Sequence, residues 1–146
     1  MRTIAIGLLV TAALLRVGAA ELDWMTDLPK AQAKAKEEKK MVLLDFTGSD
    51  WCGWCIKLQK EVFSTPAFAE YARNNLVLVE VDFPAKKNQS AELKAANAEL
   101  KKKYEVDGYP TIIVLNGEGK KIGELGYMPG GPKKFVAELD KVKKKA

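Results

Sequence analysis

Three stretches of the chain are apolar at almost every position, without regular alternation with polar residues. They are "MVLLDFT" (41–47), "LVLVEVD" (76–82) and "TIIVLN" (111–116). Such runs are typical of strands covered on both faces, so we predict three buried strands. "KIGEL" (121–125) predicts a fourth, shorter strand, which a tight turn joins to the third as an antiparallel hairpin.

The segments between these strands have the apolar spacing of helices. From Cys52 onward, Cys55, Leu58 and Val62 recur at spacings of three and four, which places them on one helix face. The chain before the first strand is rich in Ala, Lys, Glu and Gln and carries Pro29 where a first helical turn tolerates it. We predict helices over 28–40, from 52 onward, over 66–73, after a cap at Asn88 or Ser90, and over 132–144.

Helices that alternate with strands predict crossover connections and a parallel sheet core. The final hairpin adds an antiparallel edge. We therefore expect an α/β fold whose four-stranded mixed sheet is flanked by helices on both faces. With 146 residues, of which 47% are hydrophobic, the chain has the size and composition of one soluble globular domain.

The first 20 residues differ from the rest of the chain. Arg2 gives a positive start, "IAIGLLVTAALL" (4–15) is an apolar run, and Gly18 and Ala20 are small residues at the positions that signal peptidase recognises. The run is too short to span a bilayer comfortably, so we expect residues 1–20 to be a cleavable signal peptide and residues 21–146 the mature domain. The protein would be exported to the periplasm or cell envelope. An uncleaved anchor is the alternative, and we expect no stable membrane insertion after cleavage.

The charge balance gives little support for a polyanionic partner. The chain has a net charge of +5, and loss of residues 1–20 removes Arg2 and Arg16 but no acidic residue, which leaves +3. The lysine clusters are typical of solvated helix faces and a frayed tail. We expect no nucleic-acid partner.

The two cysteines, Cys52 and Cys55, both lie in "TGSDWCGWCIK" (47–57), and the chain has no histidine. Their spacing is compatible with a structural staple, with half of a metal site, or with a working dithiol. A disulfide that closes so small a loop restrains the unfolded chain little. Zinc needs four ligands, which this chain supplies only with carboxylates or a second copy. The pattern favours the dithiol, for which we expect no metal and no dissociable cofactor.

The predicted elements give the two cysteines different surroundings. Cys52 follows a buried strand and lies at the first turn of a helix, where unpaired N–H groups and the helix dipole favour an anion. Such a site lowers a thiol pKa from about 8.5 toward roughly 7. Cys55, one turn further on, should be more buried. We expect Cys52 to be the exposed nucleophile that forms a mixed disulfide, and Cys55 to be the sheltered thiol that resolves it.

Four other residues, Asp45, Pro110, Trp24 and Trp54, are singled out by their positions in the sequence. Asp45 interrupts the first strand, and a carboxyl group buried there would have a raised pKa suited to accepting the Cys55 proton; a wet strand face or a turn cap is the alternative. Pro110, in "GYPT" (108–111), precedes the third strand, where a cis bond would form a sharp turn and a trans bond would simply start the strand. We interpret Trp24 as a packing anchor and Trp54 as an exposed contact for a partner.

The order of these features resembles the thioredoxin superfamily, in particular its exported thioredoxin-like branch. Four features match over roughly residues 28–144: the strand with Asp45, "WCGWC" (51–55), "GYPT", and "TIIVLNGEGK" (111–120) followed by the final helix. The resemblance implies a thioredoxin-like fold, with Cys52 as nucleophile, Cys55 as resolving thiol and Asp45 as the proton-transfer carboxylate.

The resemblance also implies a substrate-binding surface around the cysteines. Pro110 would be cis and lie beside them, and the Tyr109 backbone would pair with the substrate main chain. Trp51 would flank the nucleophile, next to Gly53 and Trp54. Thioredoxins proper usually have Gly-Pro between the cysteines, whereas this chain has Gly-Trp, and its loop between the aspartate and the cysteines is one residue longer.

We expect an exported thiol–disulfide oxidoreductase that acts on protein disulfides as a reductant or electron relay. Strong oxidants of this superfamily commonly have a histidine between the cysteines, and this chain has none. A disulfide isomerase or oxidase that uses the same residues is one alternative, and a non-catalytic thioredoxin-like binding module with a structural disulfide is another. The expected partners of this monomer are protein thiols and disulfides, with a membrane electron donor.

Overall fold

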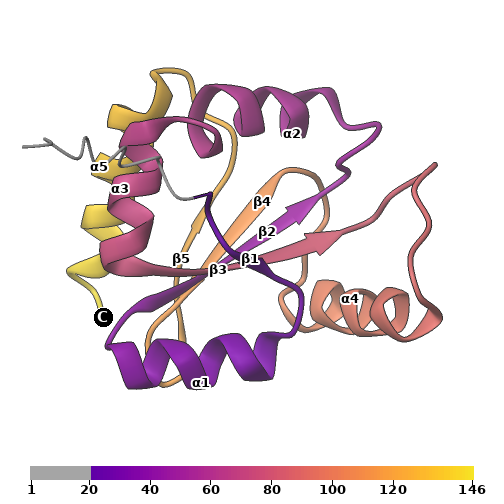
Figure 1. Ribbon diagram of the computed structural model, residues 1–146, viewed down its shortest axis with the longest axis horizontal. Coiled ribbons are helices and arrows are strands. Elements are labelled where there is room, and N and C mark those ends of the chain that lie inside the picture. Colours follow the sequence, from indigo (N-terminus) through magenta and orange to yellow (C-terminus); the bar gives the residue numbers. More distant parts are fainter. Residues whose placement is uncertain (1–20) are drawn as a thin grey trace, which may run out of the picture.

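A computed structural model describes residues 21–146, so the predicted signal peptide lies outside the described residues. A five-stranded sheet has helices packed on both of its faces (Figure 1). The strands are β1 (Trp24–Met25), β2 (Met41–Thr47), β3 (Leu76–Asp82), β4 (Thr111–Leu115) and β5 (Lys121–Leu125). The helices are α1 (Leu28–Glu38), α2 (Gly53–Leu58), α3 (Pro66–Asn75), α4 (Ala91–Lys103) and α5 (Gly131–Lys143), and α2 continues into the π-helical turn η1 (Gln59–Phe63). Within residues 21–146, no helix combines the length and the apolar character that a membrane crossing needs.

The strand order is β1-β3-β2-β4-β5, which corrects the predicted four strands to five. The additional strand, β1, pairs in parallel with β3 through only Trp24 and Met25. Two residues are too few to produce a strand periodicity that sequence reasoning detects. The predicted antiparallel hairpin of β4 and β5 is confirmed.

The direction of β4 differs from the predicted parallel core. β2 and β3 are parallel, but β4 runs antiparallel to β2, with Thr111 at its start opposite Phe46 near the end of β2. The chain leaves α4 and returns to the end of the sheet at which β2 and β3 finish (Figure 1), so β4 runs back from that end. The consequence for the site is that the "GYPT" segment and the cysteine segment meet at one end of the sheet.

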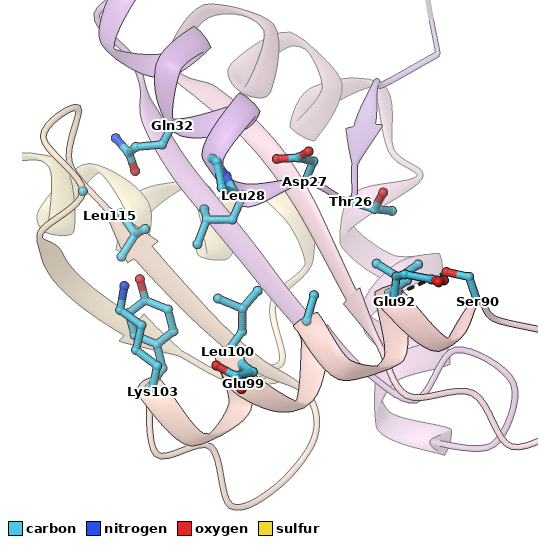
Figure 2. A pocket seen from close by; sticks show the side chains of 15 residues that line it. Thr26, Asp27, Leu28, Gln32, Ser90, Glu92, Glu99, Leu100, Lys103 and Leu115 are labelled. Atoms are coloured by element: carbon cyan, nitrogen blue, oxygen red, sulfur yellow. Dashed lines mark hydrogen bonds between the residues drawn. The ribbon is translucent and has the colours of Figure 1, made fainter.

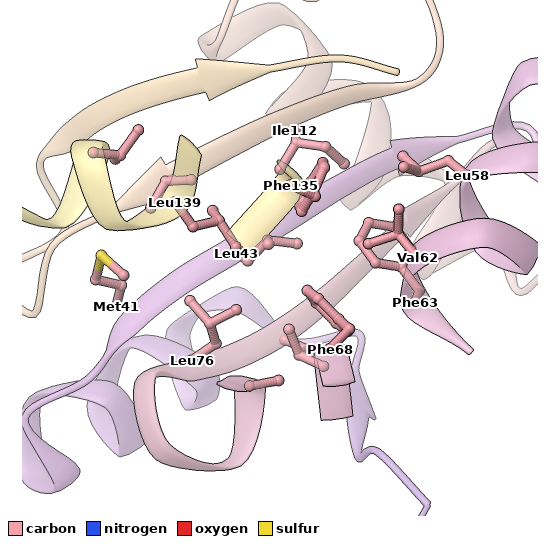
Figure 3. Packing of buried hydrophobic residues seen from close by; sticks show 14 residues of the cluster. Met41, Leu43, Leu58, Val62, Phe63, Phe68, Leu76, Ile112, Phe135 and Leu139 are labelled. Atoms are coloured by element: carbon pink, nitrogen blue, oxygen red, sulfur yellow. The ribbon is translucent and has the colours of Figure 1, made fainter. Parts of the chain in front are cut away.

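Two apolar clusters bury the two faces of the sheet. Alternate residues of β2 and β3 point to opposite faces. On one face, Met41, Leu43, Leu76 and Leu78 pack under α2, η1, α3 and α5 (Figure 3), where Phe135 of α5 also lies. The other face is covered by α1 and α4. Two positions beyond Leu43 and Leu78, the first face carries carboxyl groups instead of apolar side chains, next to the start of α2.

Candidate active site

Cys52 and Cys55 form a disulfide at the start of α2. The chain leaves β2 at Thr47 and reaches Cys52, whose backbone is extended (φ −82°, ψ 107°) and which is the N-cap residue of α2. The backbone N–H of Cys55 donates a hydrogen bond to the Cys52 sulfur at 3.3 Å. One of the otherwise unpaired donors of the helix start therefore points at Cys52, where it would stabilise a thiolate.

The predicted contrast between an exposed Cys52 and a buried Cys55 is wrong. In the disulfide, Cys52 is 7% exposed and Cys55 is 5% exposed, so both residues are buried. The two residues differ instead in what surrounds them. Cys55 lines a cavity of about 330 Å³ together with Asp45, and Cys52 is not part of that lining.

Trp51 and Tyr109 join the cysteine segment to the "GYPT" segment. The Trp51 ring meets the Tyr109 ring edge-on, with centroids 5.7 Å apart, and the Trp51 indole N–H donates a hydrogen bond to the Phe83 carbonyl at 2.8 Å. The Tyr109–Pro110 peptide bond is cis, as the resemblance implies. Half of the Trp51 surface nevertheless stays exposed.

Gly48 is a site residue that sequence reasoning missed. A Cβ atom at this position would lie 2.6 Å from Cζ2 of Trp51, which is far below van der Waals contact. The Trp51 ring therefore needs a glycine beneath it. Gly53 is different, because nothing lies within 4 Å of its Cβ position, and its backbone at the start of α2 is open to solvent.

Trp54 and Ile56 add exposed apolar surface around the disulfide. Trp54 is 57% exposed and Ile56 is 49% exposed. The Trp54 ring packs on Tyr127, with centroids 4.8 Å apart, and the Lys57 ammonium lies 5.2 Å from the centre of each of these rings. The predicted exposure of Trp54 is confirmed, whereas the apolar contribution of Ile56 and Tyr127 was not predicted from the sequence.

Asp45 lies in the cavity beneath α2, which corresponds to its predicted burial. Its Oδ1 atom is buried and lacks a hydrogen-bond partner within the described residues. Burial, followed by the negative charges of Glu80 and Asp82, raises the pKa of Asp45 to about 8. A carboxyl group with this pKa gains and loses its proton near neutral pH, which suits exchange with a thiol. The cavity lining consists of Trp24, Asp45, Thr47, Ser49, Cys55, Ile56, Gln59, Glu80 and Lys87.

Trp24 packs as predicted and also lines this cavity. Its ring lies 5.3 Å from that of Phe63, measured between centroids, and it belongs to the cavity lining.

Within residues 21–146, no group of three or more His, Cys, Asp or Glu side chains has the arrangement of a metal site.

A larger cavity, of about 790 Å³, lies between α1 and α4 on the opposite face of the sheet (Figure 2). Leu28 of α1 and Leu100 of α4 point toward one another across it. Its lining contains neither cysteine and none of the predicted site residues. The residues that could take part in a reaction therefore lie at the end of the sheet where α2 begins.

A disulfide formed by cysteines with two residues between them, at a helix start and above a titratable carboxyl group, is suited to exchange with a second disulfide. On this fold, the pair defines the class of thiol–disulfide oxidoreductases. Comparison with known proteins gives the family within this class. A family model described as "Thioredoxin-like domain" matches residues 28–143, and the chain belongs to this family.

The similarity extends to named thiol–disulfide proteins. The chain is 39% identical over 123 residues to the disulfide bond reductase DsbH of Chlamydia pneumoniae, covering 84% of this chain and 74% of DsbH. A solved structure of a DsbH oxidoreductase superposes with a TM-score of 0.82 at 38% identity, covering 88% of this chain and 89% of that one. The thiol:disulfide interchange protein DsbD of Vibrio vulnificus (strain CMCP6) is 32% identical over 119 residues, but this chain spans only 18% of DsbD.

Proposed function

We propose that the protein is an exported thiol–disulfide oxidoreductase that reduces protein disulfides or relays electrons to them. The observation that supports this most directly is the Cys52–Cys55 disulfide, which lies between a helix-start N–H on one side and the Asp45 cavity on the other. The similarity to a protein named disulfide bond reductase favours the reducing direction.

In the proposed reaction, the Cys52 thiolate attacks a substrate disulfide and forms a mixed disulfide. Asp45 accepts the proton of Cys55, whose thiolate then displaces the substrate from Cys52. Trp51, Gly53 and Trp54 contact the substrate on one side of the sulfur, and Tyr109 and Pro110 contact its main chain on the other. The partners are protein thiols and disulfides, and a membrane donor returns the electrons to the dithiol of the monomer.

Catalysed reduction of insulin disulfides by dithiothreitol tests the proposed function. We expect the wild-type protein to accelerate insulin precipitation and Cys52→Ser to be inactive, because the variant lacks the attacking sulfur. Equal inactivity of both proteins with every thiol donor tried would contradict the proposal and favour a binding module with a structural disulfide.

Alkylation of the reduced protein tests the assignment of the nucleophile. We expect iodoacetamide to modify Cys52 first, with a rate midpoint below about pH 7.5, because the Cys55 N–H and the helix start stabilise the thiolate. Peptide mapping after pulses at pH 5 to 9 measures this. Two thiols that both react with the midpoint of free cysteine, about pH 8.5, would contradict the nucleophile assignment.

Trp54 provides a test of the docking surface. Because more than half of its surface is exposed beside the disulfide, we expect Trp54→Ala to raise KM for a protein disulfide about 10-fold, as loss of an aromatic anchor does at interfaces. The rate with a small aromatic disulfide should change less than about 2-fold, since a small substrate makes no use of the surrounding surface. An equal loss of catalytic efficiency with both substrates would mean that Trp54 affects the reactivity of the cysteines and not the docking of the protein substrate.

Export through residues 1–20 is tested by the mass of the protein recovered from the envelope fraction of an exporting cell. We expect a mature chain that begins at Glu21. A chain that retains residues 1–20 in the membrane fraction would favour the uncleaved anchor.

A further inference from the structure

Asp45 faces a second carboxyl group in the cavity under α2. Asp45 and Glu80 are direct partners in the parallel register of β2 and β3, and neighbouring strands lie only about 4.8 Å apart. Both residues line the cavity that Cys55 also lines. The three groups are therefore arranged around one space, with Cys55 above and the two carboxyl groups on the sheet below.

Glu80, like Asp45, has no hydrogen-bond or ion-pair partner within the described residues, whereas the nearby Asp82 and Asp50 are both paired. Asp82 accepts hydrogen bonds from the Ser49 backbone N–H at 3.0 Å and from the Ser49 hydroxyl at 2.5 Å. Asp50 accepts three backbone N–H groups of residues 85–87. Glu80 takes part in none of the side-chain hydrogen bonds or ion pairs found within residues 21–146. A half-buried carboxyl group without such partners is costly to keep ionised.

The charges around Glu80 come from few elements. β2 contributes Asp45, β3 contributes Asp82, and the loop after β3 contributes Lys87. The helical segment above contributes only uncharged residues to the cavity lining, namely Cys55, Ile56 and Gln59. Lys87 is exposed and donates to the Ser49 hydroxyl at 3.0 Å. Burial and the charge of Asp82 raise the pKa of Glu80, and Lys87 opposes this shift. Two carboxyl groups so placed avoid being ionised together and titrate as a coupled pair.

We propose that Glu80 is a positioning residue for the resolution step: it sets the proton affinity of Asp45 and gives the proton of Asp45 a path to solvent. This inference rests on the proposed function. In the step, the Asp45 carboxylate takes the Cys55 proton, and the Cys55 thiolate attacks the Cys52 sulfur. The Cys52–Cys55 bond forms as the bond from Cys52 to the substrate sulfur breaks, and that sulfur leaves with the electron pair as a thiolate. The substrate disulfide is reduced and the dithiol is oxidised.

Glu80 provides the route by which the proton that Asp45 takes from Cys55 is released. The departing substrate thiolate takes a proton from water, and the proton held by Asp45 passes to the Glu80 carboxylate and then to solvent, because Glu80 is the less buried of the two. With its negative charge, Glu80 raises the proton affinity of Asp45. Removal of that charge should therefore make Asp45 a weaker base that ionises at lower pH.

The test is the pH dependence of resolution in single turnovers. Reduced protein is mixed with excess insulin, quenched with acid, and separated into mixed disulfide and released product between pH 5 and 9. We expect Glu80→Gln to move the rate midpoint down by about one pH unit, the size of a shift that one nearby charge produces, and Glu80→Asp to keep the wild-type midpoint. Glu124→Gln, a matched glutamate replacement on the distant strand β5, should leave the midpoint unchanged.

A carboxyl carbon NMR titration of the reduced protein gives a readout that does not depend on turnover. The titration midpoint of Asp45 should fall in Glu80→Gln and be retained in Glu80→Asp. Coincident pH profiles of wild type and Glu80→Gln, or an unchanged Asp45 midpoint, would overturn the inference while leaving the oxidoreductase intact. Failure of the wild-type protein to form any mixed disulfide would instead overturn the proposed function.

Discussion

Cys55→Ser is expected to hold the protein in covalent complexes with its substrates. Cys52 can still attack a disulfide, but the sulfur that would displace the substrate is missing. Cys55 is close enough to Cys52 to form a disulfide with it, and intramolecular groups held in reacting position have effective concentrations of about 10⁵ M or more. External thiols at millimolar concentration are a poor replacement, so the mixed disulfide should persist at least about 1,000-fold longer than in the wild type.

Non-reducing gels and mass spectrometry after expression in an exporting cell measure this trapping. The matched control is the Cys52→Ser/Cys55→Ser double variant, which has no cysteine thiol and should trap nothing. A Cys52→Ser single variant that traps the same proteins equally well would reverse the roles assigned to the two cysteines. Absence of any trapped protein would contradict disulfide exchange as the function.

Most of the fold could be predicted from apolar runs that are long enough to indicate a strand or a helix. The strands at 41–47 and 76–82 coincide with β2 and β3, because strands buried on both faces leave a nearly continuous apolar signal. The strand at 121–125 coincides with β5, whose residues are only partly buried or exposed, and it was predicted from the tight turn that joins it to the strand before it. Ser90 caps α4, with its hydroxyl accepting the Leu93 N–H at 3.1 Å. What the sequence did not reveal depends on tertiary pairing: β1 has two residues, and the reversed β4 is determined by the path of the chain around α4.

The site was predictable where a residue contradicts its surroundings. Asp45 interrupts an apolar strand, which is an anomaly visible in one sequence. Glu80 interrupts "LVLVEVD" in the same way, and this signal was available, but its meaning depends on the register that places it opposite Asp45. Gly48 and the depth of Cys52 depend on how Trp51 and the disulfide are oriented, which a linear pattern does not encode.

The buried position that suits Asp45 for proton transfer should also destabilise the protein near neutral pH. The carboxyl pKa is about 8 in the folded protein, compared with about 3.9 in an unfolded chain. Between these values the folded protein keeps a proton that the unfolded chain releases. The contribution of Asp45 to the free energy of unfolding is therefore largest below about pH 4. It falls as the pH rises toward 8 and no longer changes above that pH.

Asp45→Asn is accordingly expected to stabilise the oxidised protein. Asparagine is nearly the same shape and carries no charge, so the variant avoids this loss, and its advantage should be small at pH 4 and on the order of 4 kcal/mol at pH 7. Urea unfolding of both proteins at pH 4, 6 and 8 measures the difference. The same variant should resolve mixed disulfides more slowly, because it has no carboxylate to accept the Cys55 proton.

Asp50→Asn is the control of opposite sign for that experiment. The N–H of Ala85, followed by those of Lys87 and Lys86, lowers the pKa of Asp50, so its contribution to stability is present at neutral pH and is lost as the pH falls through the folded value. Asp50→Asn should thus weaken the protein at pH 7 and have less effect at low pH, the reverse of Asp45→Asn. If the stability gain of Asp45→Asn stays constant from pH 4 to 8, the pKa of Asp45 is not raised in the folded protein. That result would also contradict the role of Asp45 as proton acceptor.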